Sequence, residues 1–176
     1  MVSNEFEIRP ATIDDVSCVA HHRAAMFKEM GVLRANLVDD MVSCTRTYLQ
    51  RAIVTGEYIG WLAGPIGDQG VVAAGAGVQV RKTLPFPRLL PDGRADVAVG
   101  RQAIVLNVYT EPGFRRLGLA RALMYEVLGW ARATHVESLV LHAAPDGRPL
   151  YEALGFAVTN EMRFTGDLAS WQRAVD

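Results

Sequence analysis

The chain has 176 residues, of which half are hydrophobic and 21% are charged, and its formal net charge is −1. These values fit one domain over residues 1–176 and exclude a global field that attracts nucleic acid, so any anion site must be local. No apolar run approaches the ~20 residues of a membrane span, and "MVSNEFEIRP" lacks the basic start and apolar middle of a signal peptide. We therefore expect a cytoplasmic protein with neither membrane nor nucleic-acid partners, and we read Cys18 and Cys44 as buried thiols.

The first third of the chain predicts a short strand and two helices. "FEIRP" (6–10) reads as an edge strand that ends at its proline. The first helix follows, with Thr12 and Asp15 at the spacing of a capping box and Gly31 as its stop. A second helix is predicted over Leu37 to Ile53. Its expected inward residues are Met41, Cys44, Tyr48 and Ala52.

The middle of the chain changes to strand periodicity. Residues 56–65 and 69–80 predict two strands joined by the turn "GPIGDQ". Gly75 and Gly77 weaken the second strand but allow another group to approach it closely. Residues 81–100 contain three prolines and read as a long loop, which is either functional or a tolerated surface excursion.

The last part of the chain predicts strands that alternate with helices. "AIVLNVYT" (103–110) is apolar on both faces, as in a central strand, and a helix is predicted over 116–134. "SLVLHA" (138–143) predicts a further buried strand, which should run parallel to 103–110 through a right-handed crossover. A short helix capped by Asp146 and stopped by Gly155 follows, and "MRFTGDL" (162–168) predicts the last strand.

The stretch "NVYTEPGFRRLGLARALM" (107–124) predicts an anion site. It places Arg115, Arg116 and Gly118 where a helix begins after a central strand. The N-terminus of a helix offers unpaired N–H groups and partial positive charge, and glycine lets a ligand approach the backbone. The alternative is a basic turn before an amphipathic helix. The chain has neither a P-loop motif nor a G-x-G-x-x-G after a strand, so these phosphate sites are disfavoured.

Two motifs give the chain a specific resemblance. "RRLGLA" (115–120) matches the R/Q-x-x-G-x-G/A signature of the GNAT superfamily of acetyl-CoA-dependent N-acetyltransferases, and "PLYEALGF" (149–156) resembles its second signature. The resemblance covers roughly residues 5 to 168. It implies an α+β fold in which helices flank a central mixed, mostly antiparallel sheet with a splayed parallel strand pair.

The resemblance also implies which residues hold acetyl-CoA, the expected co-substrate. The signature loop would bind the coenzyme A diphosphate through its backbone amides, which here belong to Arg115, Arg116, Leu117, Gly118, Leu119 and Ala120. The strand before it would pair with the pantetheine arm through Asn107, Val108, Tyr109 and Thr110. Tyr151 corresponds to the general acid that protonates the departing thiolate. The alternative for Tyr151 is a core residue with a solvated hydroxyl.

The sequence departs from the family at two positions. Many relatives carry an asparagine seven residues before the tyrosine, where this chain has Ala144, and some carry a glutamate as general base early in the central strand, where this chain has no acid or histidine. We expect the base to be Glu29, at the end of the first helix, or His142. The alternatives are a solvated helix end and a hydrogen-bonded structural histidine.

The expected reaction is direct attack of a primary amine on the acetyl thioester in a ternary complex, without a metal. The acceptor is a small molecule or a peptide, and its pocket should lie between the N-terminal helices and residues 81–100. Candidate lining residues are Phe27, Met30, Trp61 and Phe86, each of which also suits ordinary packing. Many relatives are homodimers, which is an option here. The competing functions are a non-catalytic acyl-CoA-binding sensor or interaction module and a nucleotide binder unrelated to coenzyme A.

Overall fold

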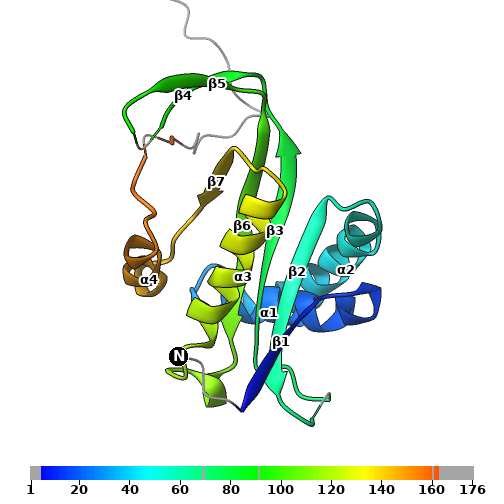
Figure 1. Cartoon of the computed structure of the whole chain (residues 1–176). Helices are drawn as coiled ribbons and strands as arrows, with labels where there is room; N and C mark the ends of the chain where they lie inside the picture. The colour runs from blue at the N-terminus through cyan, green and yellow to red at the C-terminus, as the bar shows by residue number, and fades with distance from the viewer. Residues whose placement is uncertain (1–4, 69, 91, 160, 163–176) are drawn as a thin grey trace, which may run out of the picture.

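A five-stranded mixed sheet organises the molecule, and a separate hairpin extends from one end of it (Figure 1). The computed structural model describes residues 5–68, 70–90, 92–159 and 161–162. The strands are β1 (Phe6–Pro10), β2 (Tyr58–Pro65), β3 (Ala74–Lys82), β4 (Phe86–Leu89), β5 (Ala95–Ala98), β6 (Arg101–Thr110) and β7 (Ser138–Leu141). The sheet order is β1-β2-β3-β6-β7, and only the β6–β7 pair is parallel. The predicted fold class is confirmed.

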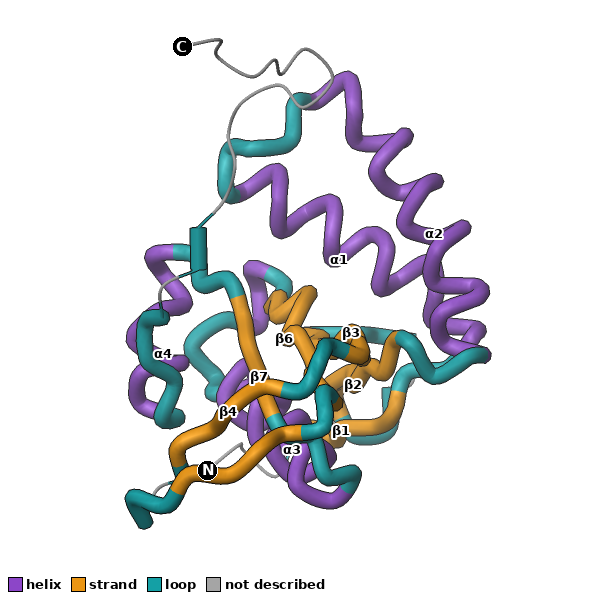
Figure 2. Tube along the Cα trace, turned by 90° about the horizontal axis from the view of Figure 1, so that it is seen from above, coloured by secondary structure: helices purple, strands orange, loops and turns teal. Residues whose placement is uncertain are grey.

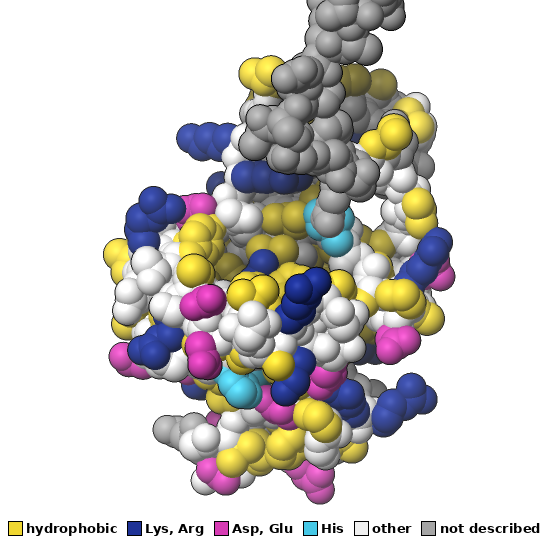
Figure 3. All heavy atoms as spheres, turned by 180° about the vertical axis from the view of Figure 1, so that it is seen from behind, with side chains coloured by type: hydrophobic (Ala, Val, Ile, Leu, Met, Phe, Trp, Pro, Cys, Tyr) yellow, Lys and Arg dark blue, Asp and Glu magenta, His cyan; other side chains and the backbone are white. Residues whose placement is uncertain are grey.

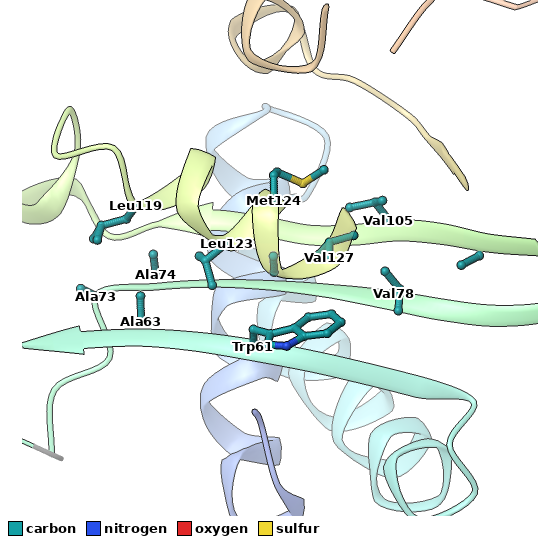
Figure 4. Packing of buried hydrophobic residues seen from close by; sticks show 12 residues of the cluster. Trp61, Ala63, Ala73, Ala74, Val78, Val105, Leu119, Leu123, Met124 and Val127 are labelled. Carbon is teal, nitrogen blue, oxygen red and sulfur yellow. The ribbon is translucent and has the colours of Figure 1, made fainter. Parts of the chain in front are cut away.

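The helices cover both faces of the sheet (Figure 2). α1 (Val16–Glu29) and α2 (Val38–Val54) lie on one face, α3 (Leu119–Ala133) lies on the other, and the short α4 (Arg148–Ala153) follows β7. Side chains alternate along β2, so that Tyr58 and Leu62 pack against α1 and α2 whereas Trp61 packs beneath α3 (Figure 4). Leu123 and Val127 of α3 belong to the same core as Trp61, between α3 and the sheet.

The β6–β7 pair separates halfway along β6. The parallel register runs from Gln102–Ser138 to Val105–Leu141 and ends there, although β6 continues to Thr110. On its other side, β6 keeps its antiparallel partner β3, but the register shifts so that two residues of β6 face one of β3. Such a β-bulge bends the strand that contains the extra residue. Among the described residues, the second half of β6 therefore has no strand paired with it on the β7 side.

The glycines of β3 let side chains cross the sheet surface closely, as their positions predicted. A Cβ on Gly75 would lie 3.2 Å from His22 Nδ1, and one on Gly77 would overlap the ring of Tyr58. The Tyr58 hydroxyl reaches across β3 to β6, where it accepts a hydrogen bond from Asn107 Nδ2 (3.3 Å). A larger residue at 77 would close this path.

Residues 81–100 are not a loop, and this prediction was wrong. β4 and β5 form an antiparallel hairpin, with Phe86 opposite Ala98. Pro87 is tolerated in β4 because the hairpin has only two strands, both of them edges. Arg88 binds Asp96 through two hydrogen bonds of 2.7 and 2.9 Å. The carboxylate of Glu137 accepts hydrogen bonds from the backbone N–H groups of Val99 and Arg101, at the two ends of the connection from β5 to β6.

Several element boundaries differ from the prediction for local reasons. The Thr12–Asp15 capping box is present, but it begins a 3-10 turn before α1. In α2, Ala52 is buried and Tyr48 is partly buried, as predicted, but Thr45 and Leu49 are buried as well, whereas Cys44 is exposed. Cys18 of α1 is only partly buried. Asp146 caps nothing, because a 3-10 turn (Pro145–Gly147) precedes α4. The predicted strand over 162–168 lies almost wholly outside the described residues.

Replacing Gly77 with alanine should lower the free energy of unfolding by about 1–3 kcal/mol, because the added methyl group overlaps the buried Tyr58 ring. The matched control is Gly129→Ala in α3, where a Cβ meets nothing within 4 Å and the helix should gain about 0.5–1 kcal/mol. Urea unfolding measures both values. Equal changes in the two variants would contradict the packing described for Gly77.

Candidate active site

The loop between β6 and α3 presents a row of unpaired backbone N–H groups. It turns twice through left-handed backbone, at Arg116 (φ 67°) and Gly118 (φ 82°), before α3 begins at Leu119. In the described part of the chain, the N–H groups from residue 116 to 121 donate to no backbone oxygen; the first such bond is from Ala122 to Gly118. No side chain caps the helix either. The loop therefore retains the donors and partial positive charge that suit an anion.

The side chain of Arg115 does not extend the anion site; it ties the loop to α1. Its Nη2 donates to both carboxylate oxygens of Glu29 (2.8 and 2.6 Å), and its Nε donates to the carbonyl of Thr110 (3.0 Å). The hydrogen bonds to Glu29 raise the pKa of Arg115. Arg116 is exposed and forms no ion pair with the described residues, so its charge is uncompensated.

Asn107 stands at the bulge, where β6 loses its parallel partner. Its backbone is left-handed (φ 56°), its side chain is 5% exposed, and its Oδ1 accepts a hydrogen bond of 2.6 Å from Arg23 Nη1. With the bond to Tyr58, both polar atoms of the amide are held. These contacts stabilise a backbone conformation that costs energy in most residues.

Val108 and Tyr109 point to opposite faces. Val108 packs against the core beneath α3, whereas the ring of Tyr109 lies 5.2 Å from that of His22 on the α1 side. The Tyr109 hydroxyl donates to Glu29 (3.0 Å), and burial together with this bond raises the pKa of Tyr109 to about 12. The open half of β6 thus presents mainly backbone groups along its free edge.

Tyr151 lies on α4 and is partly buried against the core beneath α3. Its ring meets Phe156 edge-on at 6.1 Å, and its hydroxyl has no hydrogen-bond partner among the described residues. The hydroxyl is protonated at neutral pH, as in any tyrosine, and burial raises the pKa of Tyr151 further. A protonated hydroxyl without a partner is suited to donate a proton.

The two expected bases lie in different surroundings. Glu29 is at the open end of β6, but its oxygens already accept from Arg115 and Tyr109. His142 follows β7, is exposed and lies 2.7 Å from Glu161. Only Glu29 contacts the open half of β6.

The four residues expected around an acceptor do not form one pocket. Trp61 is 7% exposed and packs against Trp130 of α3, on the face of the sheet opposite to α1. Phe27 lies beneath the guanidinium of Arg23, Met30 is 45% exposed at the end of α1, and Phe86 belongs to the β4–β5 hairpin. Phe27 alone lies beside the β6 bulge.

Sequence reasoning missed Arg23, Tyr58 and the burial of His22. A usable signal was present for Arg23, since Val16, Ala20, Arg23 and Phe27 follow one helical stripe and place a cation among inward residues. No comparable signal marks Tyr58, because its role depends on Gly77, two residues from its partner in the next strand, and on the bulge in β6.

Comparison with known proteins identifies the family. The model of the acetyltransferase (GNAT) family matches residues 24–156. The chain belongs to this family. A GCN5-related N-acetyltransferase from Ralstonia eutropha is 32% identical, with a TM-score of 0.79, 94% of this chain and 99% of that one being covered. A predicted acetyltransferase from Clostridium acetobutylicum, whose structure was determined with acetyl-CoA, is 20% identical with a TM-score of 0.75, covering 96% of this chain and 99% of that one.

Curated relatives match over a shorter part. An uncharacterized N-acetyltransferase, ycf52, from Porphyra purpurea is 26% identical over 103 residues, which are 57% of this chain. The aligned part spans 59% of that relative's length.

Among the described residues, no group of three or more His, Cys, Asp and Glu side chains is arranged to hold a metal ion. None of the described helices combines the length and apolarity needed to cross a bilayer.

His22 should make the stability of the protein depend on pH. Its ring is 3% exposed, and burial, assisted by the charge of His21, lowers the pKa of His22 to about 4. Glu111 lies 3.4 Å from Nε2 and opposes this shift, but its side chain is partly in solvent and burial dominates. The unfolded chain takes up this proton below about pH 6.5, whereas the folded chain resists it until about pH 4.

The stabilisation from neutral His22 is thus fully present above pH 6.5 and is lost as the pH falls toward 4. The decrease in unfolding free energy between pH 7 and pH 5 should be roughly 2 kcal/mol smaller in His22→Gln than in the wild type. His21→Gln, at the exposed neighbouring position, should retain most of the wild-type decrease, because burial is the larger cause of the shift in the pKa of His22. Urea unfolding at the two pH values measures this, and equal decreases in all three proteins would contradict it.

Proposed function

We propose that the protein moves the acetyl group of acetyl-CoA to a primary amine by direct attack in a ternary complex. The observation that carries this proposal is the row of backbone N–H groups over residues 116–121 that have no backbone partner in the described chain. This row directly follows the half of β6 that pairs with β3 but no longer with β7. Family membership supports the same reaction class. The enzyme from Arabidopsis thaliana that shares the fold acts, by its name, on glucosamine-6-phosphate, which is one example of an amine acceptor.

The coenzyme would be held at two places. Its diphosphate would accept hydrogen bonds from the backbone of Arg116, Leu117, Gly118, Leu119 and Ala120, with the exposed Arg116 adding charge. Its pantetheine arm would form backbone hydrogen bonds along Leu106 to Thr110, where β7 no longer pairs. No side chain has to recognise the coenzyme in this arrangement, since both contacts use backbone groups.

The chemistry would take place where β6 bulges. The nitrogen of the acceptor attacks the thioester carbon, a backbone N–H of Val108 or Tyr109 donates to the developing oxyanion, and the carbon–sulfur bond then breaks. Tyr151 donates its proton to the departing sulfur. The proton lost by the amine would pass through water to Glu29, which contacts this half of β6, rather than to His142.

The direct test is thiol release when acetyl-CoA is mixed with a panel of primary amines. The proposal predicts release that depends on both partners and a matching acetylated product by mass spectrometry. Binding of acetyl-CoA without transfer to any amine would support a sensor instead. A protein that does not bind acetyl-CoA at submillimolar concentration would disprove the proposal.

Tyr151→Phe should lower kcat by about 100-fold or more, because the thiolate would leave without a proton donor. The affinity for acetyl-CoA, measured by calorimetry, should change less than twofold. The control is Tyr125→Phe, at a tyrosine of α3 that is 56% exposed, which should behave as the wild type. An unchanged kcat in Tyr151→Phe across the accessible pH range would show that Tyr151 is not the acid.

Gly118→Ala should raise the dissociation constant of acetyl-CoA about tenfold, since a side chain at φ 82° is strained and adds an atom where the diphosphate approaches. Gly113→Ala is the matched control, because this glycine lies in the same connection without a positive φ and with no atom near an added Cβ. Similar affinities in the two variants would count against the proposed diphosphate site.

A further inference from the structure

Arg23 is a cation placed on an inward face of α1 beside the β6 bulge. Its Nη1 donates to Asn107 Oδ1 at 2.6 Å, and its guanidinium carbon lies 4.9 Å from the centre of the Phe27 ring. Both partners are neutral. α1 packs on the face of the sheet opposite to α3, so Arg23 approaches the reacting half of β6 from the side away from the α3 core.

No acid of the described chain compensates this charge. A guanidinium has five N–H donors, and Arg23 uses one of them, in a hydrogen bond to an amide oxygen. Burial lowers the pKa of Arg23, and the ionisable groups that oppose this shift are the hydroxyls of Tyr58 and Tyr48 rather than carboxylates. A partly buried cation without a counter-ion is unfavourable unless another partner repays its desolvation.

Three other arginines of the protein each donate two hydrogen bonds to a carboxylate. Arg9 binds Asp15, Arg88 binds Asp96 and Arg115 binds Glu29, with all six distances at 2.9 Å or less. Arg23 is more enclosed than these but is left without a carboxylate. Its free donors therefore remain available to a ligand that brings its own negative charge.

The position of Arg23 separates this ligand from the coenzyme diphosphate. The unpaired loop amides begin beyond Thr110, and three residues of extended strand, or about 10 Å, separate Thr110 from Asn107. Arg23 lies at the Asn107 end, where the acetyl group would react. The α1 side of the molecule is hollowed at its middle, with hydrophobic side chains lining the hollow and Lys or Arg side chains beside it (Figure 3).

We propose that the acceptor is an amine that also carries an oxyanion, a carboxylate or a phosphate, and that Arg23 binds this oxyanion while the amine reaches the thioester. The inference rests on the proposed acetyl transfer. A planar guanidinium matches either oxyanion with two parallel hydrogen bonds. The hydrocarbon part of such an acceptor would pack near Phe27, which the guanidinium already covers.

The test uses pairs of amines that differ only in the oxyanion. The pairs are amino acids with their carboxamides, and O-phosphoethanolamine with ethanolamine, each assayed with acetyl-CoA for thiol release. The oxyanion member of at least one pair should have a kcat/KM at least 30-fold higher than its neutral partner. Comparing the amino-acid pairs with the phosphate pair decides which oxyanion the site takes.

Arg23→Gln should reduce this ratio to about threefold or less, and Arg23→Lys, which keeps the charge but not the planar fork, should give an intermediate ratio. The ratio within a pair is the readout, because loss of the bond to Asn107 slows both members. Tyr58→Phe is the control: it removes the other side-chain bond of Asn107 and leaves Arg23 in place, so it should slow both members and keep the ratio. Melting temperatures establish that the variants fold.

Two results would overturn the inference alone: transfer to neutral amines as fast as to their oxyanion partners, or an Arg23→Gln variant that slows both members and keeps the ratio. The second result would mean that Arg23 only holds Asn107. Absence of acetyl-CoA binding would instead overturn the proposed function, and this inference with it. The calorimetric titration and the paired assay therefore separate the two failures.

Discussion

Strand β6 keeps its parallel partner only as far as Val105, and the arrangement of the site depends on what the strand does beyond that point. At Asn107 a β-bulge shifts the register of β6 against β3. Hydrogen bonds with Arg23 and Tyr58 hold the Asn107 side chain in place. The cost of left-handed backbone at a non-glycine residue is offset by buried hydrogen bonds on both polar atoms. The open edge is therefore a stable feature of the fold.

A second constraint holds the loop after β6 in relation to that edge. Glu29 ends α1 and binds both Arg115 of the loop and Tyr109 of the strand. One carboxylate thus joins the first helix, the open strand and the turn that precedes α3. Because Arg115 is occupied in this way, the loop offers its backbone N–H groups and Arg116 to an anion. The positive charge at this loop comes from the uncompensated Arg116 and from the partial charge at the N-terminus of α3.

Much of this was predictable from sequence, because it rests on local signals. An amphipathic run predicted a helix over 116–134, where α3 covers Leu119–Ala133, Gly155 marked the end of α4, and two signatures at a family spacing implied the fold. The β4–β5 hairpin was not predictable in this way, since its prolines are normally signs of a loop. The inward face of α2 was predicted only in part, because Thr45 is buried there and the less polar Cys44 is exposed, which only the packing of the helix decides.

The parts of the site that could not be predicted are long-range. Asn107 needs Arg23, which is 84 positions earlier, and Tyr58, which is 49 positions earlier. Glu29 was named as a base, but its partners Arg115 and Tyr109 appear only after folding. Sequence spacing reports which residues share a helix or a strand. It does not report which side chains meet across a sheet, as Arg23, Tyr58 and Asn107 do here.

The central claim is that free backbone groups of β6 and of the following loop hold the coenzyme. Amide hydrogen exchange, followed by mass spectrometry with and without saturating coenzyme A, tests it most directly. The account predicts slower exchange over residues 106–110 and 116–121, with little change in the β4–β5 hairpin. Coenzyme binding that leaves both segments exchanging at their free rates would contradict it.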